Sequence, residues 1–123
     1  MREVFKVIVI GAAALLFTFG RAAADDDGEK VFKRQCGTCH TTEAGKNRIG
    51  PSLGGIVGRK AGSAPGFSYS DANKNSGVTW DVAMLDQYLV DPRKFIPGTK
   101  MVFIGLKKPE ERRNLIDFLK TQH

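Results

Sequence analysis

The sequence is short of the residues from which metal sites and disulfide frameworks are built. Its 123 residues include only two cysteines, Cys36 and Cys39, and two histidines, His40 and His123. A structural zinc site takes four ligands, usually clustered Cys and His residues, and His123 lies at the far terminus. A thioredoxin-like dithiol is expected beside a β-α-β pattern, and the sequence has no such pattern, no strong strand and no internal repeat. The few ligands disfavour zinc, and the missing strands disfavour a dithiol oxidoreductase.

An apolar run long enough for a membrane-spanning helix, which takes about 20 residues, is also missing. Residues 7–19 form an apolar run of 13 residues. Basic residues Arg2 and Lys6 precede this run and Ala22-Ala23-Ala24 follows it, which is the pattern of a signal peptide cleaved before Asp25. We therefore expect residues 1–24 to be a signal peptide and residues 25–123 to form one exported domain. The alternative is an uncleaved segment that tethers the domain to the membrane.

Acidic residues are the minority among the charged side chains. The whole chain has a net charge of +6, and loss of residues 1–24 removes three basic residues and one acidic residue, which leaves +4. A basic surface on a small domain steers it toward acidic partners. Nucleic acid is the alternative partner for a basic protein, and export disfavours it. Since no feature of the sequence indicates an oligomer, we expect a monomer.

The most specific stretch that is present is Cys36-Gly37-Thr38-Cys39-His40. A C-x-x-C-H run is typical of covalent haem attachment. Two thiols add across the two vinyl groups of one haem, so they must lie a short, fixed distance apart. The following histidine then offers a ring nitrogen to the iron as the proximal axial ligand. The motif therefore predicts one haem c bound through Cys36, Cys39 and His40.

The remaining pattern is helical, with long glycine-rich loops at residues 41–55 and 58–66. Main helices are expected at residues 29–35, capped by the acidic residues 25–27, at residues 81–90 and at residues 109–120. Val82, Leu85, Tyr88 and Leu89 would share one apolar face of the second of these. Short helices are expected after Ser70 and after Asp91. This is an all-α chain whose loops would wrap around the haem, with Ile49, Leu53, Ile56 and Val57 lining the haem pocket or belonging to the ordinary core.

The second axial ligand decides whether the iron is open to small molecules or closed for electron transfer. Met1 would leave with the signal peptide, Met84 fits the interior of a helix, and His123 lies at the terminus. Met101 follows the turn Pro97-Gly98 and therefore lies in a loop that can fold over the haem. We expect Met101 to be the ligand. If it is not, the protein would be a peroxidase or a gas-binding sensor.

These motifs together resemble class I cytochromes c of the mitochondrial and short alphaproteobacterial type. The resemblance runs from about Gly28 to Lys120. It rests on the haem motif and on five further runs: Gly50-Pro51-Ser52-Leu53, Gly58-Arg59-Lys60, residues 64–69, residues 71–75 and residues 96–101. Asn47 and Ile49 depart from it, because the mitochondrial form usually has His and Thr there. Gln35 also departs from it, because many relatives have a lysine before the first cysteine.

The resemblance implies a role for each matching residue. His40 and Met101 would be the axial ligands, and the Pro51 carbonyl would accept a hydrogen bond from the other His40 nitrogen. The remaining implied roles concern the edges and the surroundings of the haem. Tyr69 and Trp80 would hydrogen-bond a haem propionate, and Arg59 would lie near it. Asn73, Tyr88 and Thr99 would form a polar network beside Met101. Phe103 would cover the exposed haem edge. Gly28 and Phe32 would meet Leu115 and Phe118 where the terminal helices cross.

The resemblance also implies a function, which is that of an electron carrier rather than an enzyme. The expected donor is a bc-type quinol–cytochrome reductase, and the expected acceptor is a terminal oxidase, a photosynthetic reaction centre or a denitrification reductase. A ring of basic residues would steer docking to these partners. Its expected members are Lys30, Lys33, Arg34, Arg48, Arg93, Lys94, Lys100, Lys107 and Lys108.

Overall fold

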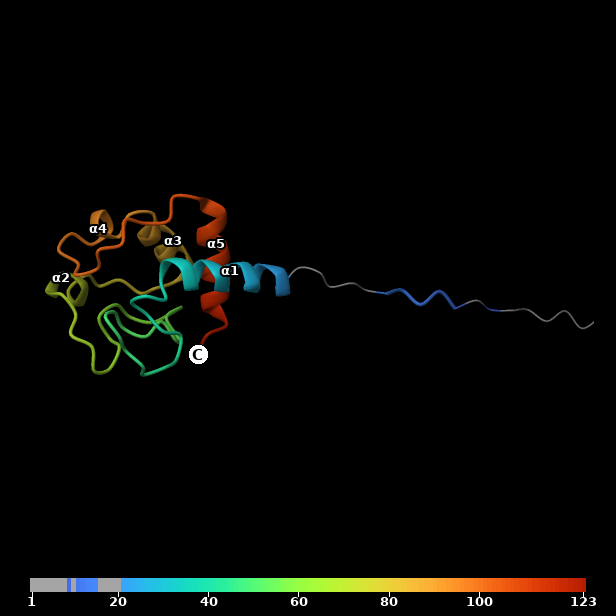
Figure 1. Cartoon of the computed structure of the whole chain (residues 1–123), viewed down its shortest axis with the longest axis horizontal. Coiled ribbons are helices and arrows are strands. Elements are labelled where there is room, and N and C mark those ends of the chain that lie inside the picture. The colour runs from blue at the N-terminus through green and yellow to red at the C-terminus, as the bar shows by residue number, and fades with distance from the viewer. Residues whose placement is uncertain (1–8, 10, 16–20) are drawn as a thin grey trace, which may run out of the picture.

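The computed structural model describes the chain except residues 1–8, 10 and 16–20 (Figure 1). Much of the expected signal peptide therefore lies outside the described residues. The described part contains α1 (Arg21–Gln35), α2 (Asp71–Lys74), α3 (Val82–Val90), α4 (Pro92–Phe95) and α5 (Pro109–Lys120). Its single extended pairing is an isolated bridge between Lys60 and Thr79. The expected all-α architecture, with three main helices, short helices and long loops, is confirmed.

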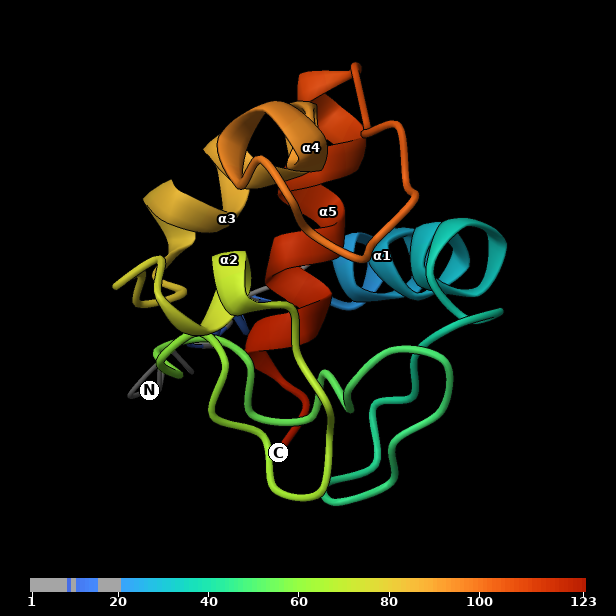
Figure 2. The same cartoon turned by 90° about the vertical axis from the view of Figure 1, so that its left-hand side faces the viewer.

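The first and last helices cross, and this crossing organises one side of the molecule (Figures 1 and 2). At the crossing, Gly28 lies against α5 so closely that a Cβ there would be 2.6 Å from the Cβ of Phe118. One turn later Phe32 packs on Phe118, with the two ring centroids 5.8 Å apart. Leu115, which is almost completely buried, completes the contact from α5. One glycine thus permits the close approach of two helices that are far apart in the sequence, and a small apolar cluster packs at their crossing.

The start of α1 differs from the prediction. The helix begins at Arg21, and the acidic residues 25–27 lie inside it rather than capping its first turn. Alanine is the best helix former, and Ala22-Ala23-Ala24 directly precede these acidic residues. The expected cleavage after Ala24 would therefore remove the first turn of this helix. The mature chain would then start at Asp25, the first of the acidic residues that were expected to cap it.

The capping residues of α3 and α4 explain where these helices begin. The Asp81 side chain accepts a hydrogen bond from the Met84 amide at 2.8 Å, and the Asp91 side chain accepts one from the Lys94 amide at 3.3 Å. Leu85, Tyr88 and Leu89 of α3 are buried as expected. Val82, the fourth residue of that apolar face, is 43% exposed and is not part of the buried core. Val82 lies at a shallow surface hollow between α3 and α5, because helical spacing fixes a face but not how far the neighbouring helix covers it.

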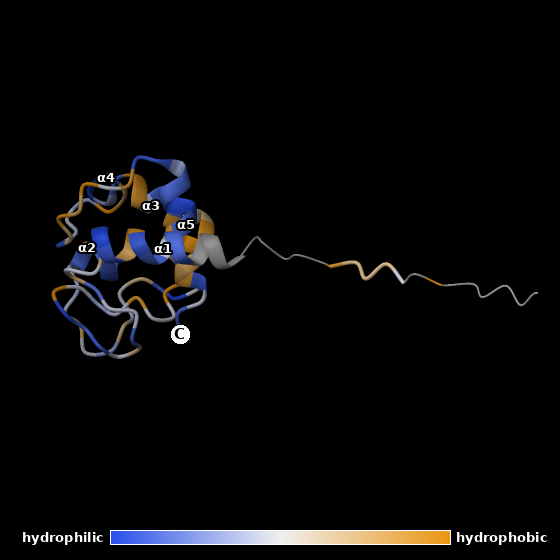
Figure 3. Ribbon diagram, turned by 45° about the vertical axis from the view of Figure 1, so that its right-hand side comes forward, coloured by the Kyte–Doolittle hydropathy of each residue, from blue (hydrophilic) through white to orange (hydrophobic). Residues whose placement is uncertain are grey.

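A buried arginine fastens the loop between α4 and α5. Arg112 donates from Nε to Asp86 at 2.8 Å and from Nη1 to the Leu106 and Lys107 carbonyls at 2.9 and 3.1 Å. Figure 3 shows hydrophobic segments on α3 and α5 and, between polar stretches, along the loops. The loops thus contribute apolar side chains to the interior. None of the described helices combines the length and the apolar composition that a membrane crossing requires.

Candidate haem site

The two cysteines lie on turns that continue α1. The Cys36 amide donates to the Phe32 carbonyl at 2.7 Å, and the His40 amide donates to the Cys36 carbonyl at 2.9 Å. The two thiols are half-buried and are not joined in a disulfide. Burial raises the pKa of the Cys36 thiol to about 12, and Cys39 adds to the shift. Hydrogen-bonded turns therefore fix the backbone of Cys36, Cys39 and His40.

His40 is oriented by the segment Gly50-Pro51. Its Nδ1 lies 2.7 Å from the Pro51 carbonyl oxygen. Because that oxygen can only accept, Nδ1 carries the hydrogen, and Nε2 keeps its lone pair. Burial lowers the pKa of His40, which favours this neutral form, although the hydrogen bond to Pro51 acts in the opposite direction. The ring thus presents an unprotonated nitrogen, the form in which imidazole binds a metal.

Gly50 is a site residue whose role the sequence patterns did not indicate. A Cβ on Gly50 would lie 2.3 Å from Cε1 of His40. The backbone angle φ of Gly50 is not positive, so glycine is required here for space rather than for conformation. The His40 ring therefore packs directly on the peptide backbone. The only signal for this role was the glycine's place directly before Pro51.

Met101 is held from two directions. The Tyr88 hydroxyl donates to the Met101 sulfur at 2.9 Å, and the Met101 amide donates to Oγ1 of Thr99 at 3.2 Å. Burial raises the pKa of Tyr88 to about 12, while hydrogen bonding to Thr99 acts in the opposite direction. Tyr88 is therefore protonated at neutral pH and is available as a donor. The loop after α4 thus places a thioether sulfur with one lone pair engaged.

All these groups face one cavity of about 390 Å³. The twelve residues that the sequence suggested for the site all line it. They are Cys36, Cys39, His40, Pro51, Arg59, Tyr69, Asn73, Trp80, Tyr88, Thr99, Met101 and Phe103. Leu85, Leu89, Leu115 and Leu119 add apolar walls from α3 and α5. The helices that make the core therefore also make one side of the cavity.

The polar groups at the cavity wall are partly satisfied by the protein. Arg59 donates to the Ser52 carbonyl at 2.8 Å and to the Gly54 carbonyl at 3.2 Å, and burial lowers its pKa. The Tyr69 hydroxyl accepts from the Ala64 amide at 3.0 Å. Oδ1 of Asn73 is buried and accepts no hydrogen bond from the described residues. A buried acceptor without a donor is costly in a purely apolar cavity, so this wall is built to face a group with polar edges.

The cavity fits a haem. Its walls are largely apolar, it holds an arginine and a tyrosine hydroxyl for acidic substituents, and both cysteines of one short segment line it. Its donor atoms are an imidazole nitrogen and a thioether sulfur, which are typical axial ligands of haem iron. Of the apolar residues proposed as pocket lining, Ile49, Leu53 and Ile56 line the cavity. Val57 belongs instead to the surrounding core.

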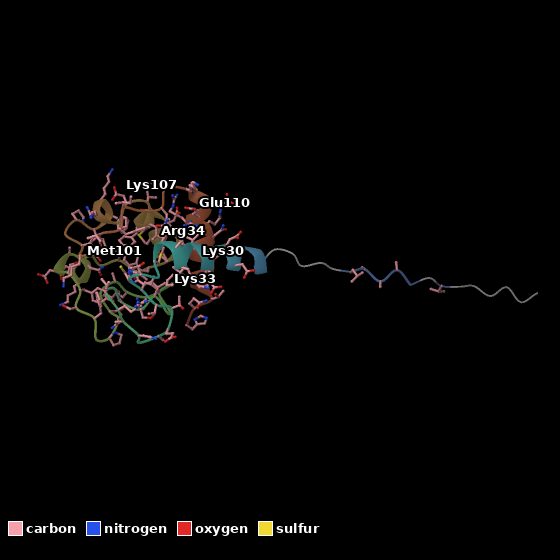
Figure 4. All side chains as sticks on the ribbon, viewed as in Figure 1. Lys30, Lys33, Arg34, Met101, Lys107 and Glu110 are labelled. Carbon is pink, nitrogen blue, oxygen red and sulfur yellow. The ribbon has the colours of Figure 1, made fainter. Side chains whose placement is uncertain are left out.

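The α1 members of the expected basic ring are paired with acidic residues. Lys33 lies 3.0 Å from Glu29 and Arg34 lies 2.8 Å from Glu111, both measured between nitrogen and oxygen atoms. Lys30 lies 3.9 Å from Asp27. The labels of these three basic residues gather on α1 in Figure 4, with Lys107 above them and Met101 further to the left. The charge of this part of the ring is therefore largely compensated within the molecule.

The other members of the expected ring are exposed and face no carboxylate within ion-pair distance among the described residues. Lys100 lines the cavity and donates to the Ser68 carbonyl at 3.1 Å. Lys107 donates to the Val90 carbonyl at 2.5 Å, and Arg93 donates to the Val102 carbonyl at 3.3 Å. Lys100 therefore places its positive charge at the cavity itself.

Comparison with known proteins agrees with a haem site. The family model for cytochrome c matches residues 26–123. The chain belongs to the cytochrome c family. It is 51% identical to cytochrome c2 of Rhodomicrobium vannielii over 98% of both chains. It is also 54% identical to cytochrome c of Chlamydomonas reinhardtii over 84% of this chain and 95% of the relative.

A solved structure agrees with the fold. Cytochrome cH from Methylobacterium extorquens matches with a TM-score of 0.74 and 52% identity, over 83% of this chain and 99% of that one. Like its family, this cytochrome carries one covalently bound haem c and serves as an electron carrier. The expected fold and cofactor are confirmed.

Proposed function

We propose that His40 and Met101 are the two axial ligands of the haem iron, and that this cytochrome is a one-electron shuttle with a closed iron site. The observation that carries the proposal is the placement of Nε2 of His40 and the sulfur of Met101 on one cavity, each positioned by other residues. A methionine opposite a histidine raises the reduction potential. With both axial positions filled, neither oxidation state of the iron needs a new ligand.

Cys36 and Cys39 would hold the haem by two thioether bonds, each formed when an S–H group adds across a vinyl double bond. Bound in this way, the haem supplies one-electron exchange between ferric and ferrous iron. The backbone hydrogen bonds of the turns after α1 fix the backbone that carries the two thiols. Covalent attachment keeps the group in place while the protein moves between partners.

The polar wall would hold the haem's acidic edge. Arg59 would offset a propionate charge, while its bonds to Ser52 and Gly54 keep the guanidinium in place. Tyr69 and Trp80 would donate hydrogen bonds to a propionate. Trp80 is buried beside Tyr88, with ring centroids 4.6 Å apart, so the indole is held rigidly. Asn73 and Thr99 would complete the polar surroundings of Met101, and Phe103 would cover the haem edge.

The rival function is that of an enzyme or a gas sensor with an open iron. It requires that Met101 leave the iron. The hydrogen bonds of Met101 to Tyr88 and Thr99 support a methionine that stays in place instead. A closed site with a buried, apolar surrounding suits electron transfer through the haem edge rather than chemistry at the iron.

The proposed partners are a bc-type quinol–cytochrome reductase as donor and, as acceptor, a terminal oxidase, a reaction centre or a denitrification reductase. The compartment would be the periplasm. The N-terminal segment supports this, and the similarity to cytochrome c2 of Rhodomicrobium vannielii extends over 98% of this chain, so it includes most of that segment. Release by osmotic shock of a protein that starts at Asp25 is the expected result. A protein that keeps residues 1–24 and stays with the membrane fraction would indicate an uncleaved membrane anchor instead.

The deciding experiment concerns the ligand Met101. The oxidised native protein should show the near-infrared charge-transfer band of an iron–sulfur bond, and Met101→Leu should abolish this band. Met84→Leu is the matched control, because Met84 packs in the core and does not line the cavity. A band that survives in Met101→Leu, or ready binding of carbon monoxide or peroxide by the native protein, would reject the closed site.

A further inference from the structure

A continuous row of hydrogen bonds leads from a distant loop to His40. Nδ2 of Asn47 donates to the Pro65 carbonyl at 2.9 Å. Oδ1 of Asn47 accepts from the Ser52 amide, also at 2.9 Å. The Pro51 carbonyl accepts from Nδ1 of His40 at 2.7 Å. The Pro51 carbonyl and the Ser52 amide are the two ends of one peptide group, so the side chain of Asn47 bonds one end and the ring of His40 bonds the other.

Hydrogen bonds in a row polarise one another, and each strengthens its neighbour by roughly 10–30%. A bond accepted from the Ser52 amide shifts electron density toward the carbonyl oxygen of the same peptide group. That oxygen then becomes a better acceptor for the hydrogen on Nδ1 of His40. A stronger bond at Nδ1 makes the opposite nitrogen, Nε2, a more basic ligand.

We propose that Asn47 is a positioning residue that lowers the reduction potential of this cytochrome by acting on His40 through the Pro51–Ser52 peptide group. The proposal rests on the proposed role of His40 as an axial ligand. A more basic axial nitrogen stabilises ferric iron relative to ferrous iron, and the potential falls accordingly. Asn47 does not line the cavity, so the route that we propose to His40 is the row of hydrogen bonds.

The orientation of the Asn47 amide is fixed by its two partners. The Pro65 carbonyl can only accept and the Ser52 amide can only donate, so the side chain cannot be rotated to exchange its oxygen and nitrogen. The surrounding loop is also braced, since Thr41 donates to the Lys46 carbonyl at 2.7 Å. The two partners thus place the amide oxygen, and not the nitrogen, opposite the Ser52 amide.

The test compares reduction potentials of the holoprotein. Asn47→Leu removes the acceptor without changing the net charge. We expect its reduction potential to rise. The equilibrium constant for its reduction by a reference couple should increase by about twofold to tenfold. In nuclear magnetic resonance spectra, the Nδ1 hydrogen of His40 should move toward the position of a weaker hydrogen bond. Asn47→Thr, also neutral and one heavy atom too short to reach both partners, should give the same direction if the leucine variant does not accumulate.

Two further variants separate this effect from a general loosening of the loop. Thr41→Val removes the bracing bond to Lys46 and leaves the row intact, so it should lower the free energy of unfolding without moving the potential. Asn47→His at pH 8 should return the potential toward the native value. The reference His pKa of about 6.5 leaves that ring neutral, with one nitrogen to accept and one to donate.

Three outcomes would overturn the proposal. An unchanged reduction potential in both Asn47→Leu and Asn47→Thr would leave Asn47 with a purely structural role between two loops. An equal rise in Thr41→Val would assign the effect to the loop as a whole. A shifted potential without any change at the Nδ1 hydrogen would exclude His40 as the route. Failure of the proposed closed iron site is seen separately, because the near-infrared band of the native protein reports on Met101 and not on Asn47.

Discussion

Gly28 in α1 packs on the carbonyl oxygen of Asn114 in α5, at a distance that no other residue type permits. A Cβ built on Gly28 would lie only 2.1 Å from that oxygen. The oxygen belongs to the backbone of a helix and cannot move aside cheaply. The approach of the two terminal helices therefore depends on the absence of one side chain.

Gly28→Ala should lower the free energy of unfolding by about 1–3 kcal/mol, the usual cost of overpacking. Alanine is a better helix former than glycine by about 1 kcal/mol, and the steric cost should exceed this gain. Denaturant unfolding of the holoprotein measures the difference. Lys30→Ala, at an exposed position of the same helix, is the control and should change stability by less than about 0.5 kcal/mol. A Gly28→Ala protein as stable as the native one would disprove the tight crossing.

Gly50 predicts a different failure, which affects the haem rather than the helices. Gly50→Ala would place a methyl group 2.3 Å from the His40 ring, so the ring must leave its bond to the Pro51 carbonyl. We expect a lower yield of protein with bound haem and loss of the absorption spectrum of the native holoprotein. Gly45→Ala is the control. Gly45 has a φ of +78°, and no atom lies within 4 Å of the position that a Cβ would take there, so that variant is strained but leaves His40 in place. Equal haem content in both variants would count against the role of Gly50.

The haem-attachment segment could be predicted from the sequence because its chemistry is local. Cys36, Cys39 and His40 lie within one short stretch of the chain, and hydrogen-bonded turns after α1 set the backbone path between them. Met101 could be chosen among few methionines, since the turn Pro97-Gly98 placed it in a loop. All twelve suggested residues line one cavity, although the placement of distant ones such as Tyr69 relied on family resemblance.

What the sequence could not predict depends on three-dimensional contact. The role of Gly50 follows from the path of the His40 ring, which is set by a segment ten residues away. The exposure of Val82 follows from where α5 ends its cover of α3. The early start of α1 reflects the strong helix propensity of its alanines, which exceeded the capping preference of the aspartates behind them. No local pattern carries the first two facts.

Tyr88 predicts a loss of stability at alkaline pH. Burial raises its pKa from 10.0 to about 12, so in this pH range the unfolded chain ionises Tyr88 while the folded protein keeps it neutral. The stabilising contribution is therefore complete below about pH 10 and is lost as the pH rises toward 12. By that point the native protein should lose on the order of 2 kcal/mol relative to Tyr88→Phe. Unfolding by denaturant at several pH values measures both proteins. Parallel stability curves from pH 8 to pH 12 would contradict the expectation.

Lys100 and Lys120 provide a matched pair for the proposed docking surface. Both are exposed lysines, but Lys100 lines the cavity, whereas Lys120 lies 3.1 Å from Asp117 at the end of α5. If acidic partners dock at the cavity, the rate of electron transfer should fall as ionic strength rises, because salt screens the attraction. Lys100→Gln should lower the rate at low salt by about two- to fivefold and flatten its salt dependence. Lys120→Gln removes the same charge and should change neither the rate at low salt nor its salt dependence.

The near-infrared band must persist in Lys100→Gln, so that any loss of rate reflects docking rather than displacement of Met101. Equal effects of the two substitutions would mean that net charge alone steers association, and a rate that ignores salt would remove the electrostatic steering altogether.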